Sequence, residues 1–248
     1  VTTTRIVRLP SWNLDLSAWS LVGETYWIAR VAPLRRSGHV QGRMQGKVLP
    51  SLRGHGSSSG GSRPSGGRGG LVQIWDCEMA GVFVVEPEVH RDERGEFWRS
   101  FCSDRLASVG IRLEVRQSNI SVNPERHTLR GLHRQRSPSR EAKVITVAAG
   151  AIHLVVADLR EGSPTRFGSE AFEIESGDRR SVVVPAGCAA GFLTAVPDTV
   201  VHYQMGDRYR PELSEGFRYD DPVLGIQWPA EPEVISLRDR AFPMIEID

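Results

Sequence analysis

The sequence predicts an all-β protein, and three observations support this. Short apolar runs rich in Val and Ile recur from Gly81 onward, turn residues such as Gly, Pro, Asp and Ser separate them, and only two segments favour a helix. Runs of this kind are typical of β-strands, and their regular spacing favours an antiparallel sandwich or barrel. The residues before about 76 differ in character and are predicted to be a mostly disordered extension.

The predicted strands share a high content of β-branched residues and have turn residues at their ends. They cover Val82–Pro87, Lys143–Gly150, Ala151–Arg160, Phe172–Gly177, Ser181–Gly187 and Thr199–Met205. A short helix is predicted at Ser103–Val109 with Ser103 as its N-cap, and a second near Ser236–Ala241.

The first part of the chain is basic and rich in Gly, Ser and Arg. Residues 1–76 contain ten basic and three acidic residues, whereas the remainder contains 21 basic and 27 acidic residues. The low-complexity run Arg53–Gly70 is typical of a flexible linker. Trp12, Trp19 and Trp27 precede it without a sustained helical or strand period. We therefore expect residues 1–75 to be disordered or weakly structured and residues 76–248 to form the folded domain.

Three interpretations of this extension remain open. In the first, the extension is a dispensable tail. One form of this interpretation is an upstream extension of the reading frame, because the chain begins with Val and Met79 lies just before the folded part. In the second, it is an organellar transit peptide, because it is rich in Arg and Ser and poor in acids. In the third, it binds nucleic acid through its charge. The first is favoured, because the arginines are dispersed and no binding motif accompanies them.

The composition is ordinary for a soluble globular protein. The chain has 248 residues, 40% of them hydrophobic and 25% charged, with a net charge of +1. No apolar run approaches the roughly 20 residues of a membrane helix, and no signal peptide is expected. Cys77, Cys102 and Cys188 are widely spaced, which argues against a disulfide framework and predicts inert thiols in a reducing compartment, the cytoplasm.

The segment from Gln117 to Lys143 holds the clearest candidate chemistry. In LRGLHRQ, His133 and Gln135 would project from one face of a strand and Arg134 from the other. A histidine is the natural general base near neutral pH, and a lysine close by can stabilise an oxyanion that develops on a carbonyl. Spacing alone favours a plainer alternative, in which His133 belongs to a hydrogen-bond network of the core and Lys143 is a solvated charge.

Eight motifs, in order along the chain from about Gly81 to Asp239, resemble those of the dTDP-4-dehydrorhamnose 3,5-epimerase family. They are DERGEF (Asp92–Phe97), QSNIS (Gln117–Ser121), LRGLHRQ (Leu129–Gln135), ADLREGSPTRFG (Ala157–Gly168), VPAGCAAGF (Val184–Phe192), DRYRPE (Asp207–Glu212), DDPVLGIQWP (Asp220–Pro229) and ISLRD (Ile235–Asp239). The resemblance implies a cupin-type jelly roll (a double-stranded β-helix) with a few short helices. It also implies an isomerase of deoxysugar biosynthesis that works without a cofactor and usually as a homodimer.

The resemblance further implies four catalytic residues. His133 would abstract the proton alpha to the C4 ketone of a dTDP-4-keto-6-deoxyhexose, and Asp239 would orient His133 and support its charged form. Lys143 would stabilise the enolate oxygen. Tyr203 would return a proton to the opposite face of the sugar, so that the carbon inverts.

Five further residues would bind the substrate by the same resemblance. Arg130 would hold the pyrophosphate or the sugar, helped by Arg94 of a neighbouring subunit. Gln117 and Asn119 would contact the sugar nucleotide, and Tyr209 would pack near the thymine.

A metal ion is not expected in this site. Metal-binding cupins use an HxH pair, a nearby Glu, and a later His after a PxG turn. Here Gln135 replaces the second His of the pair and Ala190 occupies the later position, which leaves only His133 and Glu141. Two oxygen or nitrogen ligands are too few for a tightly bound transition metal.

Some residues around the expected substrate depart from the family pattern. Ala190 stands where a histidine is common, Arg134 follows the catalytic histidine where an aromatic is usual, His90 replaces an aromatic, and Arg99 stands where an acid is common. A 3,5-epimerase, a single-position epimerase and a weakened relative therefore remain open, although the retained catalytic residues argue against the last. The alternative from another class is a non-catalytic sugar-nucleotide-binding cupin. A metal-dependent cupin oxygenase is a distant third.

Overall fold

The computed structural model describes residues 19–21, 27–29 and 72–246. The chain divides into two units, Val1–Met44 and Gln45–Asp248. In the first unit, β1 (Trp19–Leu21) pairs antiparallel with β2 (Trp27–Ala29). The predicted disorder of residues 1–75 falls almost entirely outside the described residues and stays a prediction. Among the helices of the described residues, none is long and apolar enough to cross a membrane.

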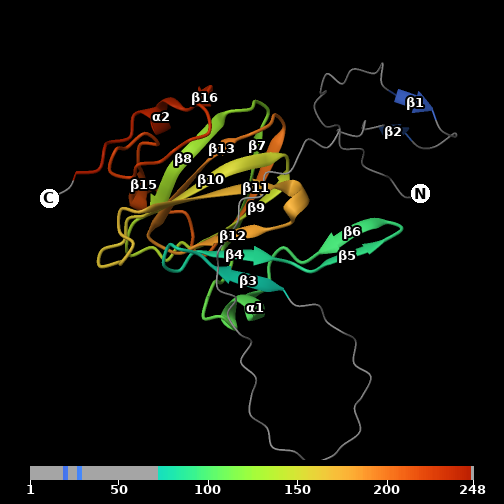
Figure 1. Ribbon diagram of the computed structural model, residues 1–248, viewed down its shortest axis with the longest axis horizontal. Helices are drawn as coiled ribbons and strands as arrows, with labels where there is room; N and C mark the ends of the chain where they lie inside the picture. The colour runs from blue at the N-terminus through green and yellow to red at the C-terminus, as the bar shows by residue number, and fades with distance from the viewer. Residues whose placement is uncertain (1–18, 22–26, 30–71, 247–248) are drawn as a thin grey trace, which may run out of the picture. The chain divides into compact units, whose positions relative to one another are not determined.

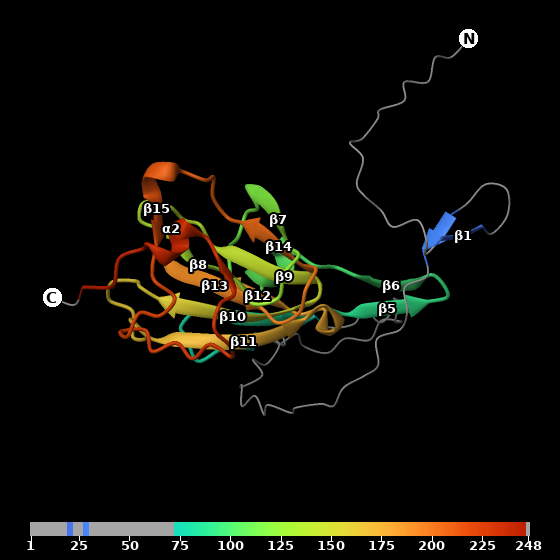
Figure 2. The ribbon, with the colours of Figure 1, turned by 90° about the horizontal axis from the view of Figure 1, so that it is seen from above.

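Two six-stranded sheets form the second unit (Figures 1 and 2). The first contains, in spatial order, β3 (Gln73–Asp76), β4 (Phe83–Glu86), β12 (Ser181–Val184), β9 (Lys143–Ala149), β14 (Thr199–Met205) and β7 (Gln117–Asn123). The second contains β11 (Ser169–Glu175), β10 (Ala151–Asp158), β13 (Cys188–Thr194), β8 (Thr128–Gln135) and β15 (Ser214–Gly216), with β16 (Val234–Ile235) beside β8. The consecutive strands β9 and β10 lie in different sheets, as do β12 and β13, which agrees with the predicted jelly roll.

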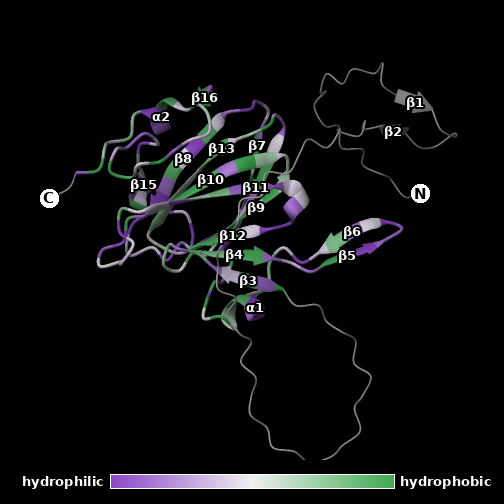
Figure 3. Cartoon of the chain, in the orientation of Figure 1, coloured by the Kyte–Doolittle hydropathy of each residue, from purple (hydrophilic) through white to green (hydrophobic). Residues whose placement is uncertain are grey.

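The main core lies between the two sheets. Ile145 of β9 and Ile152, Leu154 and Val156 of β10 are at most 1% exposed. Alternate residues of a strand point to the same face, so the intervening positions of β10 face outward. Figure 3 shows the contrast between the hydrophobic strand β4, which belongs to the core, and the hydrophilic strand β5 of the hairpin described below.

Both sheets are also covered on their outer faces. Val155 of β10 and Leu132 of β8 pack with Leu224 and Trp228, which belong to the long segment after β15. On the other sheet, α1 (Ser103–Ala107) places Leu106 against Val144 and Val183. The C-terminal segment is therefore tied to the sheet that carries β8.

A two-stranded hairpin, β5 (Val89–Asp92) and β6 (Gly95–Trp98), projects from this body in Figure 1. Three short turns of helix complete the described elements. They are the 3₁₀ turns η2 (Ser176–Asp178) and η3 (Pro211–Leu213) and the helix α2 (Leu237–Arg240).

The structure places strands in all six predicted segments and helices in both predicted places. One detail was wrong: Cys102 is the N-cap of α1, and Ser103 is the first helical residue. Strand β13 was not predicted, because its sequence CAAGFLT begins with small residues of low strand propensity. The tertiary structure explains the small residues, because β8 and β13 approach each other closely there. A Cβ added at Gly131 of β8 would lie 2.4 Å from the Cα of Gly191 in β13.

Candidate functional site

A cavity of about 660 Å³ opens between the two sheets. Its walls come from β8 and β13 of one sheet and from β7, β9 and β14 of the other, and residues of α2 form part of its rim. Its lining includes seven of the nine predicted site residues: His133, Lys143, Tyr203, Asp239, Asn119, Arg130 and Tyr209. The four predicted catalytic residues thus share one cavity.

His133 and Asp239 form a hydrogen-bonded pair at one wall of this cavity. Nε2 of His133 lies 2.9 Å from Oδ1 of Asp239, and Oδ2 of Asp239 accepts a hydrogen bond from the backbone N–H of Gly131 at 3.1 Å. Burial alone would raise the pKa of Asp239, but the contact with His133 outweighs it and holds that pKa below its usual value. The His133 side chain is 44% exposed and that of Asp239 only 7%. Because the ring lines the cavity and Nε2 meets Asp239, Nδ1 is the ring nitrogen left to act on a substrate.

The C-terminal segment brings Asp239 to this position, 106 residues after His133 in the chain. Strand β16 pairs in parallel with the start of β8, and α2 follows directly, so that Asp239 of this helix reaches His133 of β8. Ser236 is the N-cap of α2, and its hydroxyl accepts a hydrogen bond from the backbone N–H of Asp239 at 3.0 Å. Phe242 then packs edge-on against the His133 ring, with centroids 5.7 Å apart. The carboxylate is thus held by its own helix and by β8.

Lys143 opens β9 and is buried in the cavity wall. Its Nζ donates a hydrogen bond to the backbone carbonyl of His133 at 2.8 Å and lies 3.4 Å from Oε1 of Glu141. Burial lowers the pKa of Lys143, and the charge of Glu141 opposes this effect. An ammonium held directly behind the candidate base can stabilise negative charge on a substrate oxygen.

Tyr203 faces the same cavity from β14, in the other sheet from His133. Its hydroxyl lies 3.4 Å from the hydroxyl of Ser121, and its ring packs on Phe192 with centroids 6.3 Å apart. Burial raises the pKa of Tyr203 to about 12. The phenol therefore keeps its proton at neutral pH and can act as a proton donor.

The predicted substrate-binding residues divide into two groups. Arg130 lines the cavity, and its Nε donates to Oδ1 of Asn123 at 2.7 Å, which leaves the end of the guanidinium available. Gln117 is not among the lining residues; its side-chain oxygen accepts a hydrogen bond from the backbone N–H of Tyr209. Arg94 lies at the turn of the β5–β6 hairpin, 83% exposed and paired with Asp92. Its role in a neighbouring subunit stays a prediction.

Sequence reasoning missed the polar partners of these residues. The sequence presents Glu141 only as a possible metal ligand, whereas in the structure its carboxylate contacts Lys143 and Gln135. A usable signal was present: Lys47 and Lys143 are the only lysines among 31 Lys and Arg residues, so an acid two positions from Lys143 was a candidate partner. Ala190, opposite His133 in the strand register, is 8% exposed and adds only a methyl group to the lining.

The described residues contain no group of three or more His, Cys, Asp or Glu side chains placed to hold a metal ion. All three cysteines are free. Burial raises the pKa of Cys77 and Cys188 to about 12, in line with inert thiols. The pKa of Cys102 is instead lowered, first by a backbone hydrogen bond from Arg105 and then by Arg99.

Comparison with known proteins gives consistent matches over the second unit. The family model described as dTDP-4-dehydrorhamnose 3,5-epimerase matches residues 76–246. The chain is 36% identical to a dTDP-4-dehydrorhamnose 3,5-epimerase of Methanothermobacter thermautotrophicus, over 65% of this chain and 88% of that protein. It is 35% identical to a dTDP-4-dehydrorhamnose 3-epimerase of Streptomyces niveus, over 65% of this chain and 78% of that protein.

A solved structure agrees with these matches. The dTDP-4-dehydrorhamnose 3,5-epimerase of Bacillus anthracis, crystallised with TDP and PPi, superposes with a TM-score of 0.68 at 32% identity and covers 71% of this chain and 100% of its own. This confirms the predicted cupin-type fold and the predicted class of enzyme, an isomerase. The chain belongs to the dTDP-4-dehydrorhamnose 3,5-epimerase family.

Proposed function

We propose that this protein epimerises a dTDP-4-keto-6-deoxyhexose at C3, at C5 or at both, with His133 as the base. The observation that carries the proposal is the hydrogen-bonded pair of His133 and Asp239, which lines the same cavity as Lys143 and Tyr203. A base, a cation for an oxyanion and a protonated phenol are the three groups that this reaction needs.

In the first step, Nδ1 of His133 takes the proton from the carbon alpha to the C4 ketone. The electron pair of the broken C–H bond moves into the ketone, which becomes an enolate. Asp239 stabilises the imidazolium that forms, because its carboxylate already accepts a hydrogen bond at Nε2. The Lys143 ammonium stabilises the enolate oxygen.

In the second step, the enolate carbon takes a proton on its other face. Tyr203 supports this role because it comes from β14 in the sheet opposite β8, and because its phenol keeps its proton until charge develops on the substrate. The phenolate then regains a proton from water, and His133 releases its own. Loss from one face and gain on the other inverts the carbon.

The remaining cavity residues suit the nucleotide end of the substrate. The exposed guanidinium of Arg130 can pair with a pyrophosphate, and Tyr209, which is 52% exposed at the cavity, offers an aromatic face to the thymine. Asn119 adds a polar side chain, and Gln117 acts through the backbone of Tyr209. We also propose a cytoplasmic homodimer in which Arg94 of a second copy reaches the substrate.

Deuterium uptake tests the reaction directly. The protein is incubated with dTDP-4-keto-6-deoxyglucose in deuterated water, and deuterons at C3 and C5 are counted by NMR and mass spectrometry. Two deuterons indicate a 3,5-epimerase, as in the Bacillus anthracis relative, and one indicates a single-position enzyme, as in the Streptomyces niveus relative. Binding of the substrate without any uptake would instead support the non-catalytic binding protein.

Two variants assign the roles of the catalytic residues. His133→Ala is expected to lose at least about a hundredfold in uptake, the usual contribution of a general base. Tyr203→Phe is expected to keep uptake on the face of His133 while the yield of inverted product falls.

His127→Ala is the matched control for His133→Ala. His127 also pairs with a carboxylate, Glu233, at 2.8 Å, but it is not among the residues that line the cavity. Uptake in His133→Ala equal to that in His127→Ala would remove His133 from the mechanism.

A further inference from the structure

Glu141 is a buried carboxylate that the proposed reaction does not use. It is 7% exposed, it lies two residues before Lys143, and it lines the cavity. A buried carboxylate needs partners, because desolvation of an unpaired charge is costly. Its two oxygens point to two different parts of the site, Lys143 on one side and Gln135 on the other.

On the first side, Oε1 of Glu141 lies 3.4 Å from Nζ of Lys143. The same Nζ donates to the carbonyl of His133, so the ammonium is fixed between Glu141 and the strand of the base. Cys188 is the other titratable group that influences Lys143, and burial raises its pKa to about 12, so it stays neutral. Glu141 is therefore the carboxylate whose charge opposes the lowering of the Lys143 pKa by burial.

On the second side, Oε2 of Glu141 accepts a hydrogen bond from Nε2 of Gln135 at 2.7 Å. Gln135 in turn holds the backbone on both sides of Tyr209. Its Nε2 donates to the carbonyl of Arg208 at 3.0 Å, and its Oε1 accepts from the N–H of Arg210 at 2.7 Å. The partners fix the orientation of the amide, since Nε2 faces two acceptors and Oε1 faces a donor.

We propose that Glu141 is a positioning residue that aligns the two ends of this site: one oxygen holds the Lys143 ammonium beside His133, and the other holds Gln135 and thereby the loop that carries Tyr209. The catalytic meaning of this alignment rests on the proposed function. The alignment itself is a property of the free protein. Two substitutions separate the two contacts, because Glu141→Gln removes the charge but keeps an acceptor oxygen, whereas Glu141→Ala removes both.

The first measurement is the titration of Lys143 in the protein without substrate. The chain contains only Lys47 and Lys143, so lysine labelled with ¹³C at the ε position gives two signals, and Lys143→Arg identifies the second by its loss. In Glu141→Gln the Lys143 signal is expected to titrate about one to three pH units lower than in the parent, because an opposite charge at this distance is gone. An unchanged titration would overturn the contact with Lys143 as a positioning interaction.

Glu170→Gln is the matched control for this titration. The Glu170 carboxylate also accepts hydrogen bonds inside the protein, from the backbone N–H groups of Glu78 and Met79, but it is not part of the cavity lining. The Lys143 titration in this variant is expected to match that of the parent. A shift as large as that in Glu141→Gln would mean that general loosening, and not the lost charge, moves Lys143.

The second measurement is amide hydrogen exchange at Arg210, whose N–H donates to Gln135. Exchange is expected to be about fivefold faster or more in Glu141→Ala, the loss of roughly one hydrogen bond, and close to the parent rate in Glu141→Gln. Equal exchange in the parent and Glu141→Ala would overturn the link to the Tyr209 loop. If Glu141→Ala does not fold, Gln135→Met tests the link to the Tyr209 loop. The methionine side chain cannot accept the hydrogen bond of the Arg210 N–H, so exchange at Arg210 is expected to be faster than in the parent.

Activity completes the test and separates this proposal from the function. On the alkaline side of its pH profile, the kcat for deuterium uptake is expected to decline at a lower pH in Glu141→Gln than in the parent. In Glu141→Asp, which keeps the charge, this decline is expected to return part of the way toward the pH of the parent. Uptake absent from the parent would defeat the proposed function, but the lysine titration and the Arg210 exchange would still decide the role of Glu141.

Discussion

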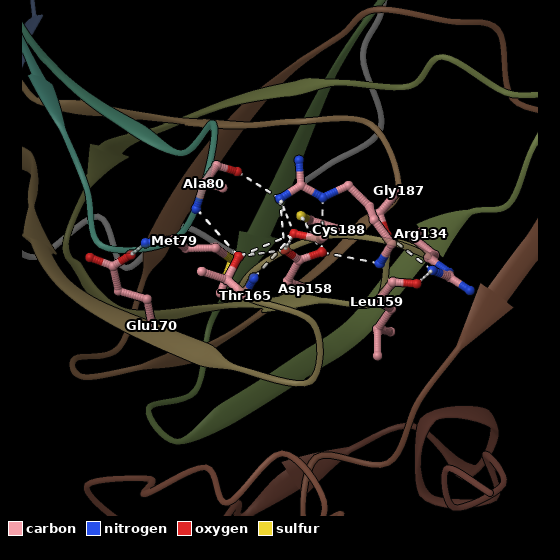
Figure 4. A network of polar contacts seen from close by, with 11 residues as sticks. Met79, Ala80, Arg134, Asp158, Leu159, Thr165, Glu170, Gly187 and Cys188 are labelled. Carbon is pink, nitrogen blue, oxygen red and sulfur yellow. Dashed lines mark hydrogen bonds and ion pairs between the residues drawn. The ribbon is translucent and has the colours of Figure 1, made fainter. Parts of the chain in front are cut away.

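Two buried aspartates in this protein have different kinds of partner: Asp158 lies in a closed hydrogen-bond network, and Asp239 pairs with the proposed base, His133. Asp158, at the end of β10, is 0% exposed and sits in the network of Figure 4. Its oxygens accept hydrogen bonds from Arg160 at 2.7 and 2.8 Å, from Ser163 at 2.5 Å and from Thr165 at 2.6 Å. Burial would raise its pKa, but these donors hold it well below the usual range.

The network around Asp158 joins segments that are distant in the chain. Arg160 also donates to the carbonyl of Ala80 at 2.6 Å, in the loop between β3 and β4. Arg134 donates to the carbonyls of Leu159 and Gly187 at 2.9 and 3.0 Å. The dashed contacts of Asp158 in Figure 4 all lead to other groups of the protein.

Asp239 uses its carboxylate differently. One oxygen accepts from the backbone of Gly131, and the other meets a histidine whose side chain is 44% exposed to the cavity. The difference teaches that burial and a lowered pKa do not by themselves mark a catalytic acid. What distinguishes Asp239 is a histidine partner that lines the cavity.

The largest effect on stability is expected from Asp158→Asn. The change leaves Arg160 partly buried without its charge partner, and breaking a buried pair costs about 3 kcal/mol in the free energy of unfolding. Urea unfolding at pH 7 measures this loss. Deuterium uptake by the folded variant is expected to equal that of the parent, and a specific loss of activity without a loss of stability would contradict the structural role.

The difference in unfolding free energy between the parent and Asp158→Asn is expected to depend on pH. Because the pKa of Asp158 is lowered in the folded protein, its stabilisation is fully present above the pKa of an unfolded aspartate, about 3.9, and is lost as the pH falls below that value toward the folded pKa. The two unfolding free energies are therefore expected to differ equally at pH 7 and pH 6 and to converge below about pH 4. A constant difference down to pH 3 would show that packing, and not charge, is responsible.

Asp239→Asn is expected to act on the reaction more than on stability. The amide oxygen can still accept from Gly131, but its NH₂ donates to Nε2 of His133, so the ring proton moves to Nδ1 and the base is lost. Losing a hydrogen bond to a charged group, about 1.5–3 kcal/mol, corresponds to roughly ten- to a hundredfold in kcat. If deuterium uptake is unchanged while the free energy of unfolding clearly falls, Asp239 has a structural role like that of Asp158 and no role in the reaction.

The smallest effect is expected from Ser236→Ala, which removes the N-cap of the helix that carries Asp239. Loss of an N-cap costs about 1 kcal/mol, and a fivefold decrease in kcat is roughly the upper limit if the helix frays. Ser236→Thr keeps the cap and is expected to restore the parent rate. A larger loss that threonine does not restore would point to a direct contact of Ser236 with substrate.

Much of the site was predictable from local patterns and motifs. The residues His133, Lys143, Tyr203 and Asp239 follow from family motifs, and the cavity does contain them. The position of Gln117 outside the cavity lining did not follow, because a motif names a residue without showing where its side chain points; the predicted role of Arg94 in a neighbouring subunit stays a prediction. Gln117 instead holds the backbone of Tyr209.

The sequence by itself determined the all-β class, six strands and two helices, and it predicted four catalytic residues that the structure places in one cavity, because strand propensity, turn residues and motifs are local properties. Only the tertiary structure decided which buried aspartate meets which partner. The parallel pairing of β16 with β8 brings Asp239 to His133, and the close approach of β8 and β13 at Gly131 and Gly191 shapes the wall behind them. These contacts join residues far apart in the chain, and strand register and packing set them, so no single stretch of sequence encodes them.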